Sequence, residues 1–545
     1  MSFSLSYKKV IEVLEKNGLL SATNAEPSGS VPFTSISYDS RYVDSDTLFI
    51  CKGVHFKEDY YFQAKNKGIR AYVSERIYDT DTVFFQVSDV KKALSVLSIE
   101  FYQRPSDSFK LIGITGTAGK TTTTYMIHSV LNAAAGHETG IISTNETYCG
   151  GEHKEAENTT PESLRLQALF SEAREHDIGY VTMEVSSQAY SVDRVYDQTF
   201  DIGIFMNIDK DHVGGPEHPS YEHYLKCKLQ LIKNSKTMLI YARTRELHKI
   251  IETARNSDCK LVMFDVPDEI AFGKDAAGSF QKKNAKTGAL TGMIPDELVY
   301  TPSPDPALLE KELGRKLYLY NITDAELLGT DGFTFTMEDP DGNVSGFNCD
   351  ISGRFNVVNA AAACVSCLEL GIDPGKIADG LHHVYVPGRM NIYKKGNTDI
   401  IVDYAHNRLT LFEFLKSAAS DYADRKINIV IGAAGKNHLR RDDIAVLCSQ
   451  YADHIYITDE DPDFEDPLEI CEDIARRIPE GGASWEIVVN RTEAIEKSIS
   501  DALSHPETKN LIAILGKGSE RFIKIRGGHE DYESDSGVVE RILEK

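Results

Sequence analysis

A glycine-rich turn that contains one lysine is the clearest chemical feature of this sequence. It reads GTAGKT at residues 116–121 and lies between the apolar segment KLIGIT, residues 110–115, and a stretch with helical spacing of apolar residues. In such a context backbone N–H groups and a helix N-terminus bind phosphate. Lys120 would bridge the β- and γ-phosphates, and the Thr121 hydroxyl would bind Mg²⁺. The sequence therefore predicts an ATP site at Gly116, Thr117, Ala118, Gly119, Lys120, Thr121 and Thr122.

The loop is tighter than the general phosphate-binding loop, because only two residues separate Gly116 from the Gly-Lys pair. A glycine-rich turn alone would also fit a purely structural turn, which is the alternative interpretation. The strand-like segment before the loop and the helical pattern after it favour nucleotide binding.

The elements around the loop alternate between strands and helices. A helix is expected from the loop to Gly136, and strands are expected at 179–185 and 200–208. After about residue 390 strands and helices alternate again, with strand patterns in DIIVDY, INIVIGA, HIYIT, EIVV and NLIAILG. This alternation predicts an α/β protein with mostly parallel sheets, whose last part is Rossmann-like.

The length of 545 residues exceeds what one core can organise, and three domains are expected at 1–108, 109–387 and 388–545. Residues 265–325 interrupt the second block. They are rich in Pro, Asp and Gly, and a surface insertion is expected there.

Composition excludes several classes of function. The net charge of −24 argues against a nucleic-acid partner, which would require a basic face. No run of about 18 apolar residues occurs and the first residues show no signal-peptide pattern, so we expect a cytoplasmic protein without membrane insertion. Nine scattered cysteines suit a reducing compartment. Cys364 and Cys367 fit core packing better than a redox pair.

Nine motifs in order along the chain resemble the Mur ligase family: SYDSR, GITGTAGKTTTT, NTTPES, MEVSSQAY, NIDKDH, GRFNVVNA, VPGRM, VDYAHN and ILGKGSE. The resemblance covers nearly the whole chain and is strongest to the branch that adds the third residue of the bacterial stem peptide. It implies an N-terminal α/β domain that binds UDP, a central ATPase-like parallel-sheet domain and a C-terminal Rossmann-like domain that binds the amino acid.

The resemblance also implies a reaction. A carboxylate of UDP-N-acetylmuramoyl-L-alanyl-D-glutamate attacks the γ-phosphate of ATP, and the amino group of the incoming amino acid then displaces phosphate from the acyl phosphate. Both steps gather negative charge, so cations and fixed dipoles are needed more than a protein nucleophile. The expected partners are small molecules, the expected cofactors are ATP and Mg²⁺, and a monomer is expected.

Metal ligands follow from the same resemblance. Glu184 and His212 would help Thr121 hold Mg²⁺, and Lys228 would be carbamylated by CO₂ to become a carboxylate-like ligand. The alternatives are a solvated glutamate, an ordinary loop histidine and a surface lysine, and the neighbouring Lys226 leaves the register of the lysine open.

The remaining site residues are also implied by resemblance. Asn359 resembles an adenine contact, although it could instead cap its helix. The third domain would reach the nucleotide with Arg389, Asp403 and His406. The muramoyl dipeptide would be bound by Ser40, Asn158, Thr159, Thr160, Ser186 and Arg194. Three positions depart from the commoner family pattern: Ala118, Val192 and Ser519.

The choice of amino acid depends on a four-residue motif. The diaminopimelate-adding branch has Asp-Asn-Pro-Arg there, and its arginine binds the distal carboxylate. The matching residues here are Glu460, Asp461, Pro462 and Asp463, which favour a distal ammonium. Gly516 and Glu520 would hold the other end of the amino acid. L-lysine is therefore predicted first, L-ornithine second and meso-diaminopimelate third, and a solvated acidic loop is the alternative interpretation.

Two other functions are compatible with part of this pattern. A folylpolyglutamate synthase would share the loop but would leave SYDSR and the N-terminal block without a role. A catalytically inactive nucleotide-binding regulatory protein would not need Lys120, Thr121, Glu184, His212 and Lys228 intact.

Overall fold

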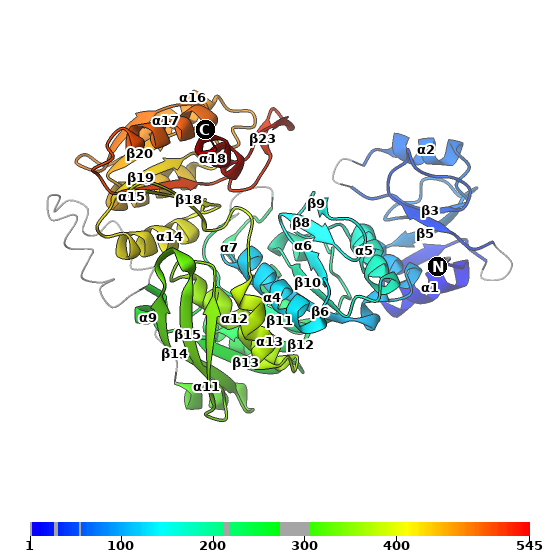
Figure 1. Ribbon diagram of the computed structural model, residues 1–545. Coiled ribbons are helices and arrows are strands. Elements are labelled where there is room, and N and C mark those ends of the chain that lie inside the picture. Colours follow the sequence, from blue (N-terminus) through cyan, green and yellow to red (C-terminus); the bar gives the residue numbers. More distant parts are fainter. Residues whose placement is uncertain are drawn as a thin grey trace.

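The protein is an α/β molecule with three main sheets that follow one another along the chain (Figure 1). The computed structural model describes residues 3–26, 31–53, 56–211, 213, 217–272 and 305–544. The expected α/β class with parallel sheets is confirmed. The expected domain boundaries stay a prediction.

The first sheet has five strands in the order β1-β5-β4-β3-β2, parallel except for β1. Helix α1 places Val10 and Leu14 in the apolar core of this part, and the Ser6 side chain caps its first turn. The elements are α1 Tyr7–Lys16, β1 Leu20–Thr23, β2 Ser35–Ser37, β3 Thr47–Ile50, α2 Glu58–Asn66, β4 Ala71–Ser74, β5 Val83–Val87, α3 Val90–Phe101 and the 3₁₀ helix η1 Pro105–Ser108.

The second sheet has 11 strands in the order β16-β15-β14-β13-β12-β11-β6-β10-β7-β8-β9. Its middle strands are parallel, and antiparallel strands extend it at both ends. The strands are β6 Lys110–Thr115, β7 Gly140–Ile142, β8 Glu146–Tyr148, β9 Lys154–Glu155, β10 Tyr180–Glu184, β11 Phe200–Phe205, β12 Ser235–Tyr241, β13 Lys260–Asp265, β14 Tyr318–Leu327, β15 Phe333–Glu338 and β16 Val344–Cys349.

Helices cover the second sheet. They are α4 Lys120–Ala135, α5 Ser163–Glu175, α6 Ser187–Ser191, α7 Tyr221–Lys233, α8 Leu247–Arg255, α9 Asp268–Phe272, α11 Pro306–Leu313, α12 Asn356–Glu369, α13 Pro374–His382 and the 3₁₀ helix η3 Gly329–Asp331. The Cys364 and Cys367 thiols of α12 are fully buried in the apolar core, as the core-packing interpretation predicts.

The interpretation of residues 265–325 as a surface insertion is wrong for its first and last parts, since Val266 and Ala271 are also buried in the core. Strand β14 pairs in parallel with β13, and Tyr320 and Ile322 are buried in the core. The charged residues that follow in the same strand masked its apolar alternation in the sequence. Residues 273–304 lie outside the described residues.

The third sheet has six strands in the order β17-β18-β22-β19-β20-β21, parallel except for β17. The short hairpin β23-β24 lies beside it. The elements are β17 Asn391–Lys395, β18 Thr398–Asp403, α14 Arg408–Asp421, β19 Lys426–Ile431, α15 His438–Tyr451, β20 His454–Ile457, α16 Pro467–Arg477, β21 Ser484–Ile487, α17 Arg491–Leu503, β22 Asn510–Leu515, β23 Phe522–Ile525, β24 Gly528–Asp531 and α18 Asp535–Leu543.

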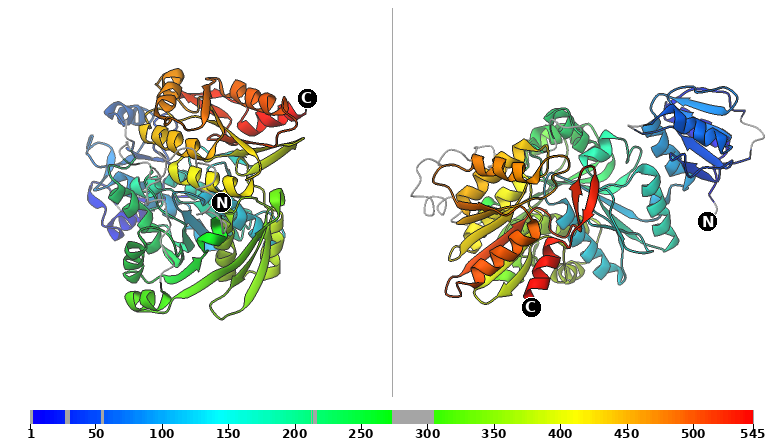
Figure 2. Two further views of the ribbon diagram at one scale, coloured as in Figure 1. Left: turned by 90° about the vertical axis from the view of Figure 1, so that its left-hand side faces the viewer. Right: turned by 90° about the horizontal axis from the view of Figure 1, so that it is seen from above.

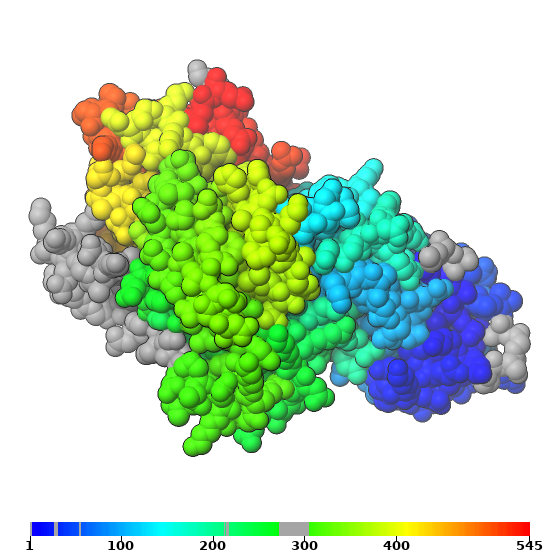
Figure 3. Space-filling model, turned by 60° about the horizontal axis from the view of Figure 1, so that its bottom comes forward, coloured from blue at the N-terminus to red at the C-terminus, as the bar shows by residue number. Residues whose placement is uncertain are grey.

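The first and third sheets lie at opposite ends of the molecule, with the second between them (Figure 2). The space-filling view shows the same order, with the N-terminal part in blue and the C-terminal part in yellow to red (Figure 3). The order of the three sheets leaves the carboxyl end of β6 facing the third sheet.

None of the described helices combines the length and the apolar character needed to cross a membrane.

Candidate functional site

The glycine-rich loop connects β6 to α4 and is fixed by two asparagine side chains. The Ala118 N–H donates to Asn207 Oδ1 over 2.8 Å. Gly119 precedes α4 with a φ of 81°, and a Cβ there would lie 2.4 Å from Asn359 Oδ1. Only glycine combines this backbone angle with such a close neighbour. Asn207 and Asn359 therefore both lie against the backbone of the loop.

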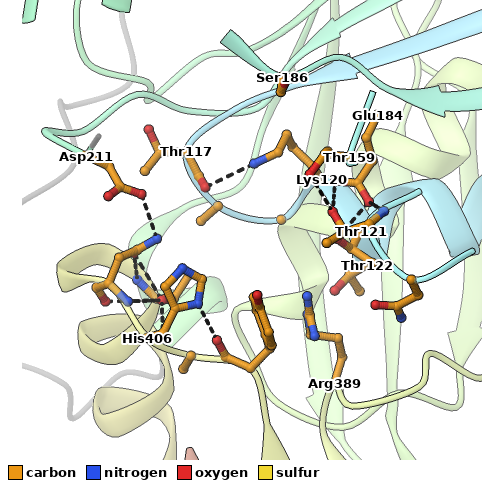
Figure 4. Close-up of a pocket in the computed structure, with 18 of the residues that line it drawn as sticks. Thr117, Lys120, Thr121, Thr122, Thr159, Glu184, Ser186, Asp211, Arg389 and His406 are labelled. Atoms are coloured by element: carbon orange, nitrogen blue, oxygen red, sulfur yellow. Dashed lines mark hydrogen bonds between the residues drawn. The ribbon is translucent and has the colours of Figure 1, made fainter. Parts of the chain in front are cut away.

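Lys120 points back over the loop (Figure 4). Its Nζ donates to the carbonyl oxygens of Gly116, at 2.9 Å, and Thr117, at 3.3 Å. Burial lowers the pKa of Lys120, while the charges of Glu184 and Asp211 oppose that shift. An anion at the loop would restore the stability of the ammonium form.

Glu184 ends β10 and is fully buried beside the first turn of α4. Its Oε1 accepts hydrogen bonds from the Thr121 hydroxyl at 2.9 Å and from the Thr144 N–H at 2.8 Å, and its Oε2 accepts one from the Thr144 hydroxyl at 3.2 Å. These three donors are neutral. A buried carboxylate with neutral donors and a nearby hydroxyl suits a hard cation such as Mg²⁺. His212 lies outside the described residues.

Lys228 reaches the loop from α7 and is 2% exposed. Its Nζ donates to the Gly116 carbonyl oxygen at 2.8 Å and lies 4.7 Å from the centre of the Tyr224 ring. Burial, together with the charge of Lys120, lowers the pKa of Lys228 well below its ordinary value. Lys226 is exposed, so the lysine that faces the loop is Lys228.

Asn359 lies inside α12, so the interpretation that it caps this helix is wrong. The helix begins at Asn356, and the Nδ2 of Asn359 donates to the Oδ1 of Asn356 over 2.8 Å. Its Oδ1 accepts a hydrogen bond from the Thr123 hydroxyl at 3.3 Å and faces Gly119. Local sequence patterns could not predict the contact between Asn359 and Gly119, which are about 240 positions apart.

The third sheet contributes residues at the carboxyl end of β18 and just before β17. The Asp403 carboxylate accepts hydrogen bonds from the N–H groups of Met390, at 2.9 Å, and Ala405, at 2.8 Å, and burial raises its pKa. Arg389 stacks 4.1 Å from the centre of the Tyr404 ring. Asp403 therefore fixes the segment that carries Arg389.

His406 and its neighbour face the second sheet. His406 Nδ1 lies 2.7 Å from the Tyr404 carbonyl oxygen, and burial lowers the histidine's pKa well below its ordinary value. Asn407 caps α14 and also donates to Asp211 Oδ2 over 3.1 Å. The Asn407–Asp211 contact joins the part of the chain that carries the loop to the part that carries His406 (Figure 4).

One cavity of about 480 Å³ lies between the second and third sheets. The predicted site residues that line it are Thr117, Ala118, Gly119, Lys120, Thr121, Thr122, Asn158, Thr159, Glu184, Ser186, Arg194, Lys228, Asn359, Arg389, Asp403, His406 and Glu520. The cavity therefore joins basic side chains and loop amides from two sheets, which is the arrangement that binds a polyphosphate.

Other predicted residues lie away from this lining. The Gly116 carbonyl oxygen accepts hydrogen bonds from both Lys120 and Lys228. Thr160 is buried: its hydroxyl bridges the backbone of Glu184 and Ser186, and its carbonyl accepts a hydrogen bond from Arg194 at 2.9 Å. Thr160 thus positions two lining residues.

Ser40 belongs to the first sheet's part of the chain, where its hydroxyl donates to Gln63 over 3.1 Å. It does not line the cavity between the other two sheets. The first part is joined to the second by an ion pair between the half-buried Lys52 and Glu162. A substrate that used both Ser40 and the cavity would contact two parts of the chain.

The acidic motif lies behind the cavity and is held by protein donors. Asp461 accepts hydrogen bonds from Lys517 Nζ and from the Lys524 N–H, both at 2.9 Å. Lys517 also donates to Glu520 over 2.6 Å, and Glu520 accepts a hydrogen bond from the Tyr404 hydroxyl over 2.6 Å. The motif is therefore connected to the cavity through Lys517 and Glu520.

The other acids of the motif have different surroundings. Asp463 accepts a hydrogen bond from the Gly527 N–H at 2.8 Å, and Lys436 Nζ lies 3.6 Å from its other oxygen. Glu460 is buried 3.8 Å from Arg440, and burial raises its pKa to about 7. A Cβ at Gly516 would lie 2.8 Å from Glu460, so glycine is required for this packing. Pro462 carries no polar side chain.

Sequence reasoning missed several lining residues. Asn207 and Asp211 belong to the motif NIDKDH, and Tyr404 belongs to VDYAHN. Their place in these motifs could have identified them as site residues. Thr144 and Lys524 also line the cavity, but no motif marks them.

Comparisons with known proteins agree with this architecture. Residues 114–294 match the Mur ligase middle domain, and residues 388–522 match the family described as Mur ligase, glutamate ligase domain. A UDP-N-acetylmuramyl-tripeptide synthetase of Lactobacillus acidophilus is 32% identical over 99% of this chain and 98% of its own length. A UDP-N-acetylmuramoyl-L-alanyl-D-glutamate–L-lysine ligase of Streptococcus pneumoniae is 32% identical over 99% of this chain and 100% of its own length.

Solved structures share the fold. A UDP-N-acetylmuramoyl-L-alanyl-D-glutamate–2,6-diaminopimelate ligase superposes with a TM-score of 0.61 and 20% identity, covering 99% of each chain. A MurF of Acinetobacter baumannii superposes with a TM-score of 0.59 and 17% identity, covering 100% of each chain.

Proposed function

The chain belongs to the Mur ligase family, and on that premise we propose that it adds L-lysine to UDP-N-acetylmuramoyl-L-alanyl-D-glutamate with cleavage of ATP. The observation that carries the proposal is the single cavity in which the phosphate loop faces Arg389, Asp403 and His406 of the third sheet. Full-length similarity to enzymes named for this lysine ligation supports the choice of substrates.

ATP would bind with its phosphates on the loop. Lys120 would leave its two carbonyl partners to neutralise the β- and γ-phosphates, and the amides of 117–122 would bind their oxygens. Asn359 would contact the adenine from α12. Arg389, Asp403 and His406 would close over the nucleotide from the third sheet, and this closure would exclude water from the reacting phosphate.

Two chemical steps follow. A substrate carboxylate oxygen attacks the γ-phosphorus and ADP leaves, which gives an acyl phosphate. The amine of the incoming amino acid then attacks the acyl carbon, phosphate leaves, and the amine loses a proton. Negative charge gathers on phosphate oxygens in the first step and on the acyl oxygen in the second, where Lys120 and the loop amides lie close.

The residues around Glu184 fit Mg²⁺, which would supply charge neutralisation between the phosphates when bound. Thr121 and Glu184 would hold it, together with His212. Lys228 would contribute as a carbamate: its neutral amine adds to CO₂ and releases one proton. The buried position of Lys228 and its lowered pKa favour the neutral amine that this addition needs.

The muramoyl dipeptide would extend from the cavity toward the first sheet. Arg194 suits one of its carboxylates, with Asn158, Thr159 and Ser186 beside it and Thr160 positioning them. Ser40 would contact the uridine nucleotide at the far end. The separation of Ser40 from the cavity is consistent with a substrate that spans two parts of the protein.

L-lysine is proposed because acids surround the place where an arginine would bind a distal carboxylate. Asp461 and Asp463 would attract a distal ammonium, while Gly516 and Glu520 would hold the α-amino and α-carboxylate end. A lysine side chain would compete with Lys436 for Asp463. L-ornithine is the second candidate and meso-diaminopimelate the third.

The decisive experiment measures ADP release with each substrate omitted in turn and with a panel of amino acids. We expect release to require ATP, the UDP-muramoyl dipeptide and an amino acid, with L-lysine preferred. Robust turnover with meso-diaminopimelate and none with lysine would contradict the proposed specificity. Nucleotide binding without release under any combination would instead support an inactive regulatory protein.

A further inference from the structure

Two histidines and a cysteine converge beside the catalytic cavity. The side-chain ligand atoms of His218, His223 and Cys227 all lie within 4.8 Å of one another. His223 and Cys227 are one helical turn apart on α7, so their side chains share a face. His218 precedes the helix, and its ring lies against that of His223. None of these residues has a role in the proposed reaction.

The distances within this cluster are close to those of a metal site. The Nδ1 atoms of His218 and His223 are 2.9 Å apart, and Cys227 Sγ lies 3.9 Å from His223 Nδ1. Two imidazole nitrogens at this distance must share a proton, because two lone pairs would repel each other. In a tetrahedral zinc site the corresponding distances are about 3.4 Å between nitrogens and about 3.6 Å between nitrogen and sulfur. The two distances to His223 thus differ from those of a zinc site by about half an ångström or less, and all three ligand atoms lie within 4.8 Å of one another. A cation could replace the shared proton after a small closing movement of the three side chains.

The surroundings hold the cluster in place. His218 is fully buried and Cys227 is 6% exposed. The second ring nitrogen of His218, Nε2, lies 2.9 Å from the Ser187 hydroxyl, and the ring packs edge-on against Tyr224. A hydrogen bond from the second nitrogen is what orients metal-binding histidines in general, because it fixes the tautomer that leaves the first nitrogen free to bind.

We propose that His218, His223 and Cys227 form a binding site for a divalent cation that prefers nitrogen and sulfur ligands, with Zn²⁺ as the principal ion. Mg²⁺ prefers oxygen, so this site is distinct from the proposed nucleotide metal site. On binding, the Cys227 thiol releases its proton to solvent and the thiolate bonds to the metal. The ion would tie residue 218 to α7, the helix that carries Lys228.

The test uses Co²⁺ as a spectroscopic substitute for Zn²⁺ on the full-length protein, stripped of metal with a chelator and kept reduced. We expect one Co²⁺ per chain, visible absorption of a four-coordinate ion and a near-ultraviolet thiolate-to-cobalt band, all lost on adding Zn²⁺. Cys227→Ser should lose the thiolate band. His223→Gln should weaken Co²⁺ binding by about tenfold or more.

Matched controls separate this site from general cysteine and histidine binding. Cys259→Ser removes another buried thiol of the same sheet region, and His248→Gln removes an exposed histidine on α8. Both should keep the wild-type spectrum. A wild-type spectrum without a thiolate band, or a band that persists in Cys227→Ser, would overturn the proposal. No ATP or substrate is present, so this outcome is independent of the ligase assignment.

Discussion

The phosphate loop and the acidic motif of the third sheet are both dense in charge, but the charges are partnered differently. Lys120 and Lys228 donate to neutral carbonyl oxygens of the loop. In the motif, Asp461 pairs with Lys517, and Asp463 lies near Lys436. A phosphate meets the Lys120 cation, whose carbonyl partners are weak competitors. An incoming ammonium must compete with protein cations, so the motif selects among substrates while the loop provides binding strength.

The largest effect is expected at the loop. Lys120→Ala should abolish ligation, with a loss of at least about 10³-fold in kcat, because it removes the cation nearest the transferred phosphate. The fold should survive, since the Lys120 ammonium donates its hydrogen bonds to two loop carbonyl oxygens and to no other element of the described structure. ADP release measures the first effect and circular dichroism the second. Turnover near that of the wild type would remove the loop from the mechanism.

Lys228→Ala should have the second largest effect, a loss of about 10²-fold or more in kcat, because a buried oxygen ligand of the metal would be missing. If the lysine acts as a carbamate, acetate or another small carboxylate in solution should restore part of the activity. Lys226→Ala is the matched control, since Lys226 lies two residues away on the same helix and is exposed. Full activity of Lys228→Ala without any added carboxylate would end the carbamate proposal.

A smaller and more selective effect is expected in the acidic motif. Asp463→Arg should raise the KM for L-lysine by about tenfold, because it reverses the charge that would meet the distal ammonium. ATP-site function should be spared, so the KM for ATP is the internal control. An equal rise in the KM for L-lysine and the KM for ATP would indicate that Asp463 stabilises the fold through its hydrogen bond from Gly527 and does not recognise the amino acid.

The smallest effect concerns the pH dependence of stability. Burial raises the pKa of Glu460 from 4.5 to about 7, so the folded protein binds more protons than the unfolded chain between these values. The free energy of unfolding therefore falls as pH rises through that window, by up to about 3 kcal/mol. Glu460→Gln lacks this titration.

The comparison of Glu460→Gln with the wild type supplies the measurement. Melting temperatures at pH 5, 6 and 7 should show the variant gaining stability relative to the wild type as pH rises. A difference that stays constant across this range would show that Glu460 does not titrate there.

Local patterns in the sequence were sufficient for the parts that are continuous in the chain. The strand expected at 110–115 is β6, and Gly136 ends α4 as predicted, with a φ of 74°. The loop between them was found because glycine spacing, an apolar strand and a helical period are all encoded within about 30 residues. The resemblance of ordered motifs then identified the family, which the comparisons confirm.

Contacts between distant segments were decided by the tertiary structure. Asn359 against Gly119, Lys228 on the Gly116 carbonyl and the entry of β14 into the second sheet all join segments that no local period relates. The same holds for His218, whose ring nitrogens contact Ser187 on one side and His223 of α7 on the other. The sequence determined which side chains could do chemistry, because residue type and local spacing are written in it. Only the packing of sheets and helices decided which of those side chains meet, because long-range pairing depends on the whole core.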